Sequence, residues 1–300
     1  MRRWIQIKPK YLLMIAYPMM NLAYADGARD WENVPINTNI LFGYYTYSNS
    51  EVSVDPALPI DGLSIDAHVP ILRYARTFDL NGQVGGLQLV APFGRVTGRV
   101  DNTHLKTSAR GVGDIAAIFV ANIYGAPALT KKEFTTWTPQ PYLTGSLSVT
   151  APTGDYNGDD LLNMGKNRWT FKPQLSYGYY LNSDTLLAIN TNIQFFTHND
   201  EYKNTGTLAQ KELFGVEAHL SKNLNPKSWL AISSFYSYGG ETKVNNENQG
   251  NKQKTLRVGI GGNYNINSAT ALSISLNRSV MKESYTPDVT NFSINISRAF

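Results

Sequence analysis

The sequence predicts an all-β protein, a transmembrane antiparallel up-and-down β-barrel of about 12 strands. Three observations lead to this fold class. Apolar and small polar residues alternate along many segments, which is the side-chain period of a strand. Only 17% of the 300 residues are charged, against roughly 25% in an average soluble chain. No apolar run approaches the ~20 residues of a membrane-spanning helix, which argues against a helical membrane protein.

The first 25 residues have the composition of a cleaved export signal. A positive region precedes a short apolar stretch, residues 11–20, and a small-x-small cleavage site, Ala23-Tyr24-Ala25. The cations of the positive region are Arg2, Arg3, Lys8 and Lys10. They account for the whole net charge of +4, so the remaining chain has no basic excess with which to bind nucleic acid. We expect a signal peptide over 1–25 and one domain over 26–300 in the outer membrane of a Gram-negative bacterium.

Several kinds of chemistry have no support in the composition. Cysteine is absent, which excludes disulfide scaffolds, thiolate metal sites and thiol catalysis. The four histidines are scattered, so a zinc site is not expected. Phosphate-binding glycine loops are missing as well. We therefore expect no metal, no cofactor and no nucleic-acid partner.

Alternation is clearest near the C-terminus. In residues 270–280, Leu272, Ile274 and Leu276 alternate with serine, asparagine and alanine, and residues 291–300 follow the same pattern. A soluble β-sandwich alternates too, but its solvent-facing positions usually carry more charge. The polar set here is small and uncharged, which favours a barrel whose polar face lines a lumen and whose apolar face meets lipid.

About twelve segments of this kind occur, and their connections alternate between short and long. The segments are 38–48, 63–78, 83–96, 113–124, 140–152, 169–181, 185–197, 211–221, 228–239, 254–266, 270–280 and 289–300. The long polar connections are 49–62, 97–112, 153–168, 198–210, 240–253 and 281–288. An even strand count with short periplasmic turns and longer outer loops is typical of an outer-membrane barrel.

Aromatic residues near the predicted strand ends indicate interfacial girdles. They are Tyr44, Trp169, Tyr177, Tyr179, Trp229, Tyr236 and Tyr264; the alternative is that they fill the core of a soluble sandwich. Phe300 closes the last strand and resembles the C-terminal signal that the barrel assembly machinery reads. Arg298 departs from that signal, because it stands where an apolar residue is usual.

Two motifs carry a family resemblance. Gly111-Val112-Gly113-Asp114 precedes one predicted strand, and residues 141–156, which include Pro152, Thr153, Gly154 and Asp155, cover the next. With these motifs the chain resembles the MetA-pathway of phenol degradation family, whose members are outer-membrane barrels often labelled as transporters. The resemblance implies uptake of small apolar or aromatic molecules, and it marks no catalytic residue.

If the apolar sets face lipid, seven titratable residues are expected to face the lumen. They are Asp66, His68, Asp114, Lys172, Glu217, His219 and Arg257. Both signs occur, so these groups either form ion pairs that brace the barrel or form a constriction that orients a permeating solute. Twelve strands lie between the filled eight-stranded and the open sixteen-stranded barrels. We expect a narrow passage, gated by residues 26–36 inside the lumen.

Passive uptake of small hydrophobic or aromatic molecules is therefore the expected function, and two alternatives stay open. One is a structural or adhesion barrel with a plugged lumen, whose outer loops do the work. In either case we expect outer-membrane lipid and lipopolysaccharide as partners. The other is a phospholipase-type enzyme, because His219 and Ser221 lie two residues apart on one strand face. Their predicted lumen position, near the short-turn end of the strand, argues against this enzyme.

Overall fold

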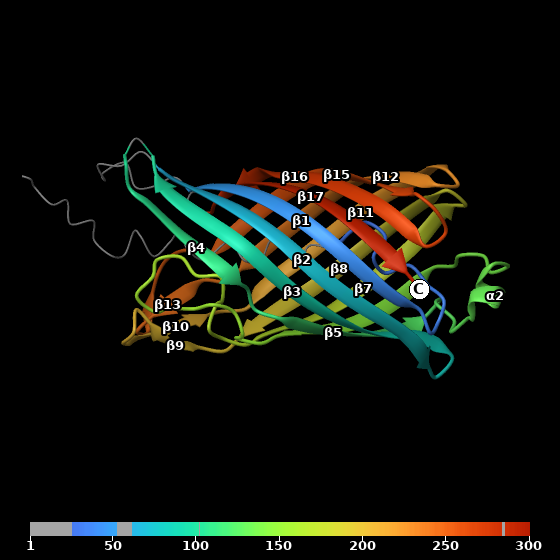
Figure 1. Cartoon of the computed structure of the whole chain (residues 1–300), viewed down its shortest axis with the longest axis horizontal. Helices are drawn as coiled ribbons and strands as arrows, with labels where there is room; N and C mark the ends of the chain where they lie inside the picture. The colour runs from blue at the N-terminus through green and yellow to red at the C-terminus, as the bar shows by residue number, and fades with distance from the viewer. Residues whose placement is uncertain (1–25, 53–61, 102, 284–285) are drawn as a thin grey trace, which may run out of the picture.

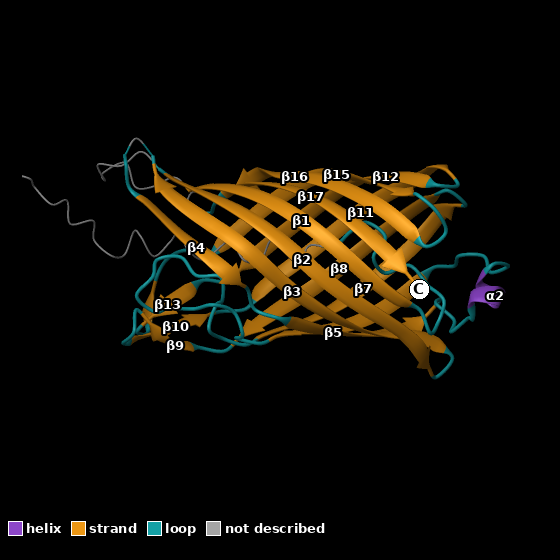
Figure 2. Ribbon diagram, viewed as in Figure 1, coloured by secondary structure: helices purple, strands orange, loops and turns teal. Residues whose placement is uncertain are grey.

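The computed structural model describes residues 26–52, 62–101, 103–283 and 286–300; the expected signal peptide, 1–25, lies outside them. Almost all regular structure in these ranges is strand (Figure 2). No helix in the described part of the chain has the length and apolar character needed to cross a membrane.

Twelve strands of the described residues form one closed antiparallel barrel (Figure 1). They are β1 (Asn39–Val52), β2 (Leu63–Leu80), β3 (Gln83–Val100), β5 (Ala116–Tyr124), β6 (Tyr142–Thr150), β7 (Thr170–Asn182), β8 (Thr185–Phe196), β11 (Leu213–Asn225), β12 (Ser228–Gly239), β15 (Gln253–Asn265), β16 (Thr270–Lys282) and β17 (Asp288–Ala299). Each strand pairs with its neighbours in barrel order, and β1 pairs with β17 to close the ring. The predicted fold class is confirmed.

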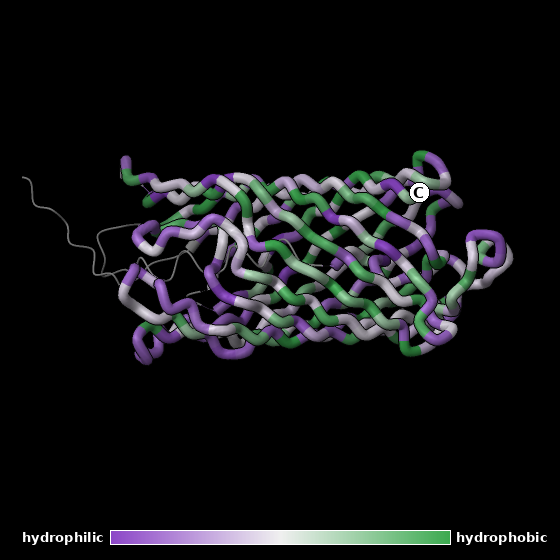
Figure 3. The backbone as a smooth tube through the Cα atoms, turned by 60° about the horizontal axis from the view of Figure 1, so that its bottom comes forward, coloured by the Kyte–Doolittle hydropathy of each residue, from purple (hydrophilic) through white to green (hydrophobic). Residues whose placement is uncertain are grey.

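The strand register separates an apolar outer face from a polar inner face. Ile232 on β12 and Ile260 on β15 lie directly opposite each other and are 66% and 64% exposed. On β1, Thr46 and Ser48 point the other way and are buried. Large apolar side chains exposed over a whole surface are expected only where that surface meets an apolar partner, and Figure 3 shows apolar residues distributed along the strands.

The two ends of the barrel differ, and we call them the turn end and the loop end. At the turn end, β2 and β3 are joined by Asn81-Gly82, whose φ angles of 53° and 80° suit a type I′ hairpin. The long 125–141 connection also lies there and contains the helix α2 (Lys131–Phe134), capped by Thr130. The C-terminus is at the same end (Figure 1).

At the loop end, two connections that were expected to be irregular contain strands. β9 (Asn199–Tyr202), β10 (Gly206–Gln210), β13 (Thr242–Val244) and β14 (Glu247–Asn248) form a separate four-stranded sheet. Its centre is the pairing of β10 with β13, in which Leu208 lies opposite Val244. These strands are two to five residues long, too short for alternation to reveal them.

The predicted loop 97–112 is also wrong. β3 continues to Val100, and β4 (Lys106–Val112) pairs with the loop-end half of β3, while β5 pairs with its turn-end half. β4 carries two charged residues among its seven and one large apolar residue, Val112, so it lacks the apolar alternation of a lipid-facing strand. Among the described strands, β4 pairs with β3 alone.

The break between β4 and β5 holds the 151–169 loop in place. The carboxylate of Asp114 accepts hydrogen bonds from the backbone N–H groups of Gly154 at 2.9 Å and Lys166 at 2.8 Å. A side chain at Gly154 would collide with the backbone of Gly113 and Asp114, so the close approach requires glycine. The first family motif therefore has a structural role at the loop end.

The second motif binds back to the β4–β5 break. We call the hydrogen bonds of Asp114, Thr153 and Asp155 between this break and the 151–169 loop the clasp. The carboxylate of Asp155 accepts a hydrogen bond from the backbone N–H of Val112 at 2.9 Å, and the hydroxyl of Thr153 accepts one from Ile115 at 3.0 Å. Gly111 has a φ of 147°, and a side chain there would collide with the carboxylate of Asp155. Pro152 directly precedes Thr153.

The clasp also places two buried charges beside each other. Burial raises the pKa of Asp114, and the N–H groups of Lys166 and Gly154 lower it. Burial lowers the pKa of Lys166 to about 8, against the raising effect of the Asp114 carboxylate. Each group is thus a counter-charge that reduces the desolvation cost of the other.

Replacing Asp114 with alanine is expected to release the 151–169 loop. Two backbone N–H groups lose their acceptor, which costs about 1–3 kcal/mol when such groups stay buried, so the loop opens more often. Trypsin should then cut after Lys166 and Arg168 about tenfold faster or more. Asp160→Ala, an exposed position in the same loop, is the control; equal cleavage rates in the two variants would contradict the clasp.

Candidate functional site in the barrel lumen

The segment 26–36, which we call the plug, lies inside the barrel as expected. Arg29 Nε donates a hydrogen bond to the hydroxyl of Ser221 on β11 at 2.8 Å. Glu32 accepts one from the phenol of Tyr180 on β7 at 2.7 Å. Asp30 and Arg73 on β2 form an ion pair at 3.5 Å. These contacts attach the plug to both sides of the lumen.

Asp26 is the most connected residue of the plug. Its carboxylate accepts hydrogen bonds from Trp31 at 2.9 Å, from Gln174 on β7 at 2.5 Å and from Asn190 on β8 at 3.4 Å. Its backbone nitrogen donates to the Glu217 carboxylate on β11 at 3.3 Å. The start of the plug is therefore fixed near the middle of the lumen.

An apolar contact fixes the next part of the plug. Trp31 is buried against Val120 on β5, Tyr142 on β6 and Leu186 on β8. The ring of Tyr142 in turn occupies the space above Gly178 on β7, where a Cβ atom would collide with it. This cluster closes the lumen on the β5–β8 side.

Among the residues that the structure describes, two cavities border the plug and the loop end of the lumen. The inner cavity, of about 200 Å³, lies beside the plug, and the outer cavity, of about 160 Å³, lies toward the loop end. Four residues border both: Thr46, Ser148, Lys172 and Phe235. They come from β1, β6, β7 and β12, and we call this ring the waist.

The wall of β15–β17 is lined by small polar side chains. Its inward positions in the inner cavity are glycine, serine and asparagine, namely Gly259, Gly261, Ser273, Ser275, Asn277, Asn291, Ser293 and Asn295. The plug's side-chain bonds to barrel strands, as the described residues show them, go to β2, β7, β8 and β11. The small polar residues that alternate with apolar residues in the C-terminal strands thus border the space beside the plug.

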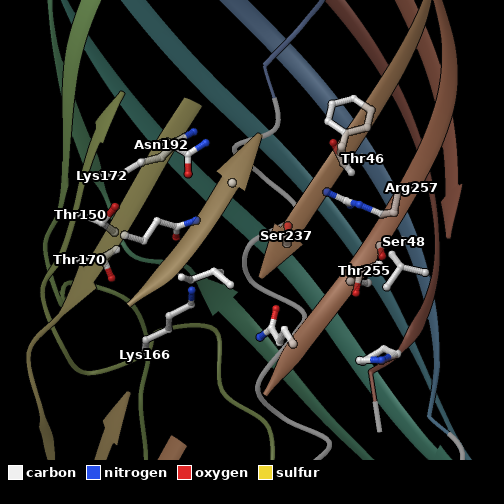
Figure 4. Close-up of a pocket in the computed structure, with 18 of the residues that line it drawn as sticks. Thr46, Ser48, Thr150, Lys166, Thr170, Lys172, Asn192, Ser237, Thr255 and Arg257 are labelled. Atoms are coloured by element: carbon white, nitrogen blue, oxygen red, sulfur yellow. The ribbon is translucent and has the colours of Figure 1, made fainter. Parts of the chain in front are cut away.

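The outer cavity combines apolar side chains with charges of both signs. Val69, Val96, Met164, Leu213, Phe235 and Pro287 are among its apolar residues. Lys166 and Lys172 lie on one side and Arg257 on the other (Figure 4). Asp114 and Glu217 supply the carboxylates. Such a cavity suits a solute with an apolar body and one polar or anionic end.

Arg257 has an unusual environment among these cations. Its guanidinium lies 5.4 Å from the centroid of the Phe235 ring, its cross-strand neighbour on β12, which is a cation–π distance. The negative charge of the Glu217 carboxylate favours the charged form of Arg257. In the described part of the chain no group accepts a hydrogen bond from Arg257, although a guanidinium carries five N–H donors.

The predicted lumen residues are distributed unevenly. Lys172, Glu217 and Arg257 line the cavities, and His219 points inward but is enclosed in the wall. His219 Nδ1 lies 2.8 Å from the Ser233 hydroxyl, and its Nε2 lies 3.6 Å from the Glu217 carboxylate. Asp114 reaches the outer cavity from the β4–β5 break rather than from a strand.

The lumen positions predicted for Asp66 and His68 are wrong. His68 lies directly opposite Tyr47, and Asp66 opposite Asn49, on the same face as the exposed Tyr45. At the loop end, the inward residues of β2 are apolar because Ile65 and Ala67 pack against the 151–169 loop in a cluster with Leu162 and Met164. The polar residues of this half of β2 therefore point outward.

Two aromatic predictions fail for a related reason. Tyr44 and Trp229 face inward instead of joining an interfacial girdle. Arg73 donates a hydrogen bond to the phenol of Tyr44 at 3.2 Å, and the guanidinium of Arg29 lies 5.4 Å from the ring of Trp229. Both rings thus belong to the contacts that surround the plug.

Sequence reasoning missed the strand residues that hold the plug. Arg73, Gln174, Tyr180 and Asn190 all contact residues 26–32. Alternation in the correct parity would have put Arg73 in the lumen, because Ile71 and Ala75 on the same face are buried. Nothing in the sequence links these positions to the plug.

The pair that suggested a phospholipase is not assembled in this structure. Ser221 accepts a hydrogen bond from Arg29 and donates one to the carbonyl of Leu186 at 3.4 Å. His219 instead contacts Ser233. Within the described ranges, no three His, Asp or Glu side chains are grouped as a metal site would need.

Several solved structures share this fold. The COG4313 outer membrane channel from Pseudomonas putida F1 has a TM-score of 0.81 and 23% identity, and the alignment covers 92% of this chain and 100% of that one. The β domain of the Bordetella autotransporter BrkA has a TM-score of 0.53 and 8% identity, over 88% and 100% of the two chains. The translocator domain of NalP from Neisseria meningitidis has a TM-score of 0.53 and 9% identity, over 87% and 88%.

At these identities the structural likeness shows the fold. Among curated proteins no match is found. Residues 46–290, from the middle of β1 to the start of β17, match the family described as "Putative MetA-pathway of phenol degradation". The chain belongs to this family, as its two motifs suggested.

Proposed function

We propose that the protein is a passive outer-membrane channel for small hydrophobic or aromatic molecules in a Gram-negative bacterium, and not an enzyme. The observation that carries the proposal is the outer cavity, which opens to the waist and combines apolar side chains with a guanidinium that lacks a hydrogen-bond acceptor within the described residues. A solute with an aromatic body and a polar or anionic end matches both features.

The plug is the gate in this proposal. Each of its hydrogen bonds to the wall contributes about 0.5–1.5 kcal/mol, so partial release is within reach of thermal motion, whereas release of all contacts at once is not. A solute that leaves the waist enters the inner cavity, between the plug and the small side chains of β15–β17. No energy source is needed for such a step.

The plug also favours one alternative, a structural or adhesion barrel whose lumen stays closed. Its contacts with β2, β7, β8 and β11 could hold it permanently. Liposome swelling with the purified protein separates the two functions. Flux of small aromatic solutes supports the channel, and its absence for every such solute supports the closed barrel.

We further propose that the C-terminal strand guides assembly. Phe300 exchanges two backbone hydrogen bonds with Asn39, at 2.9 and 3.1 Å, where β17 meets β1, and its side chain is exposed. Arg298 lies opposite Leu41 on the outer face, two residues from the turn end, where a charge can reach the interface. Both residues are accessible to the barrel assembly machinery at the closing seam.

Deletion of residues 27–35 is expected to raise single-channel conductance several-fold in planar bilayers. The deletion joins the inner cavity to the space that the plug fills, which widens the narrowest part of the path. Removal of 245–250, an exposed turn of the loop-end sheet, is a control of similar kind outside the lumen. If both variants conduct like the wild type, the plug does not limit passage.

Arg257→Gln is expected to lower benzoate flux into liposomes about tenfold while it changes benzyl alcohol flux little. The variant removes the charge but keeps a hydrogen-bonding side chain, so only the anionic solute loses a charge-assisted contact. Arg278→Gln is the matched control, because Arg278 lies on the outer face and pairs with Asp288 at 3.7 Å. Unchanged flux with a lower unfolding temperature would leave only a bracing role for Arg257.

Removal of residues 1–25 is expected to strengthen the plug. It would turn the backbone nitrogen of Asp26 into an α-ammonium beside the Glu217 carboxylate, at the present 3.3 Å. A refolded chain that begins at Asp26 should open less often in planar bilayers than one with two alanines before Asp26. Glu217→Gln should abolish this difference; identical gating of the two chains without that substitution would disprove the ammonium contact.

A further inference from the structure

Four cations form two cross-strand pairs on the outer face of the barrel at the loop end. On β3 and β4, Arg95 lies directly opposite Arg110, and Arg99 lies directly opposite Lys106. All four side chains are exposed. We call this group the basic ladder; it lies outside the lumen and takes no part in the proposed passage.

The basic ladder is unfavourable as an isolated arrangement. Directly opposed residues in an antiparallel pair have Cβ atoms about 4.5–5.5 Å apart, and like charges there are destabilising. The nearby carboxylates include Asp66, which pairs with Arg99 at 2.5 Å, and Asp101, which accepts a hydrogen bond from Ser64. Asp155 is also near, and its carboxylate accepts a hydrogen bond from the backbone N–H of Val112. In the described residues, Arg95, Lys106 and Arg110 form no hydrogen bond or ion pair through their side chains.

Other cations at the loop end are arranged differently. Lys254 pairs with Glu283 at 3.3 Å, Arg278 with Asp288 at 3.7 Å, and Lys211 with Glu241 at 2.5 Å. Each of these three cations has an acidic partner within the chain, whereas Lys243 and Lys282 form no ion pair in the described residues. The basic ladder has one acidic partner for four cations, which points to a partner outside the chain.

The basic ladder begins where the apolar outer face ends. Phe93 lies opposite Val112, and both are exposed, at 40% and 44%. Arg95 and Arg110 form the next outward pair, about 7 Å further along the strands. At the same level on β1, the phenols of Tyr45 and Tyr47 bond to His68 and Asp66, as expected for aromatic residues at a membrane interface.

We propose that the basic ladder binds the phosphate groups of lipopolysaccharide. The inference rests on the outer-membrane location, in which the long loops face outward and the outer leaflet consists of lipopolysaccharide. Acyl chains would then pack on Phe93 and Val112, and the lipid A phosphates would reach Arg95 and Arg110 by charge-assisted hydrogen bonds. A soluble anion would gain no contact with the apolar pair below.

The same contact would stabilise the pairing of β4 with β3. This strand has a partner on one side only, and its outer face carries two cations opposite two others. A bound phosphate between opposed cations changes their repulsion into attraction. Lipopolysaccharide would thus hold β4 against β3 at the level where lipid gives way to water.

The test uses the purified, folded barrel and its Arg95→Gln/Arg110→Gln double variant. The variant should bind rough lipopolysaccharide at least about tenfold more weakly, because two charge-assisted contacts are lost. Lys254→Gln/Arg278→Gln removes two cations from the same end and should change binding less than about twofold. Equal affinity of the ladder variant and the wild type would overturn the proposal.

Two further measurements identify the ligand and separate binding from misfolding. Bisphosphorylated lipid A should compete strongly, and phosphatidylglycerol vesicles and inorganic phosphate weakly; equal competition by phosphatidylglycerol would overturn the assignment to lipopolysaccharide. In lipid-free detergent the ladder variant should unfold at a higher temperature than the wild type, because the opposed charges are gone. A lower unfolding temperature in detergent would show that the cations already have partners within the protein.

Discussion

The need to pair every backbone N–H and C=O group within lipid determines this structure. An unpaired group in hydrocarbon costs several kcal/mol, so the strands must close into a ring, and β1 must meet β17. Closure places every second side chain inside. The inner face is therefore polar, and unpaired charges in so narrow a lumen are costly. The plug reduces this cost because its carboxylates and guanidinium bond to the polar groups of the wall.

The plug explains why charges that are distant in sequence can share one lumen. Arg73 faces Asp30, Ser221 faces Arg29, and Glu217 faces the nitrogen of Asp26. Arg257 is the exception, with an aromatic ring and a carboxylate nearby but no hydrogen-bond acceptor in the described residues. We therefore place the proposed solute site in the outer cavity, beside Arg257.

The sequence predicted the barrel well because lipid acts on every strand in the same way, so the alternation of Leu272, Ile274 and Leu276 survives along the membrane-spanning part. The prediction failed where lipid ends. At the loop end of β2 the inner face is apolar and the outer face is polar, the reverse of the membrane-spanning part. Ile65 packs under the 151–169 loop, and Asp66 lies on the outer face. The plug contacts could not be predicted, because they depend on the path of residues 26–36 through space.

The same boundary separates the role that we propose for Arg257 from the role that we propose for the basic ladder. Arg257 lies inside, beside the ring of Phe235, where a low dielectric would strengthen its attraction for the anionic end of the proposed solute. Arg95 and Arg110 lie on the outer face, two residues along the strands from exposed Phe93 and Val112. There the number of neighbouring cations would decide the attraction for lipid phosphates. A strand with lipid on one face and a lumen on the other can therefore present cations to a solute or to the surrounding lipid, and the parity of the residue decides which.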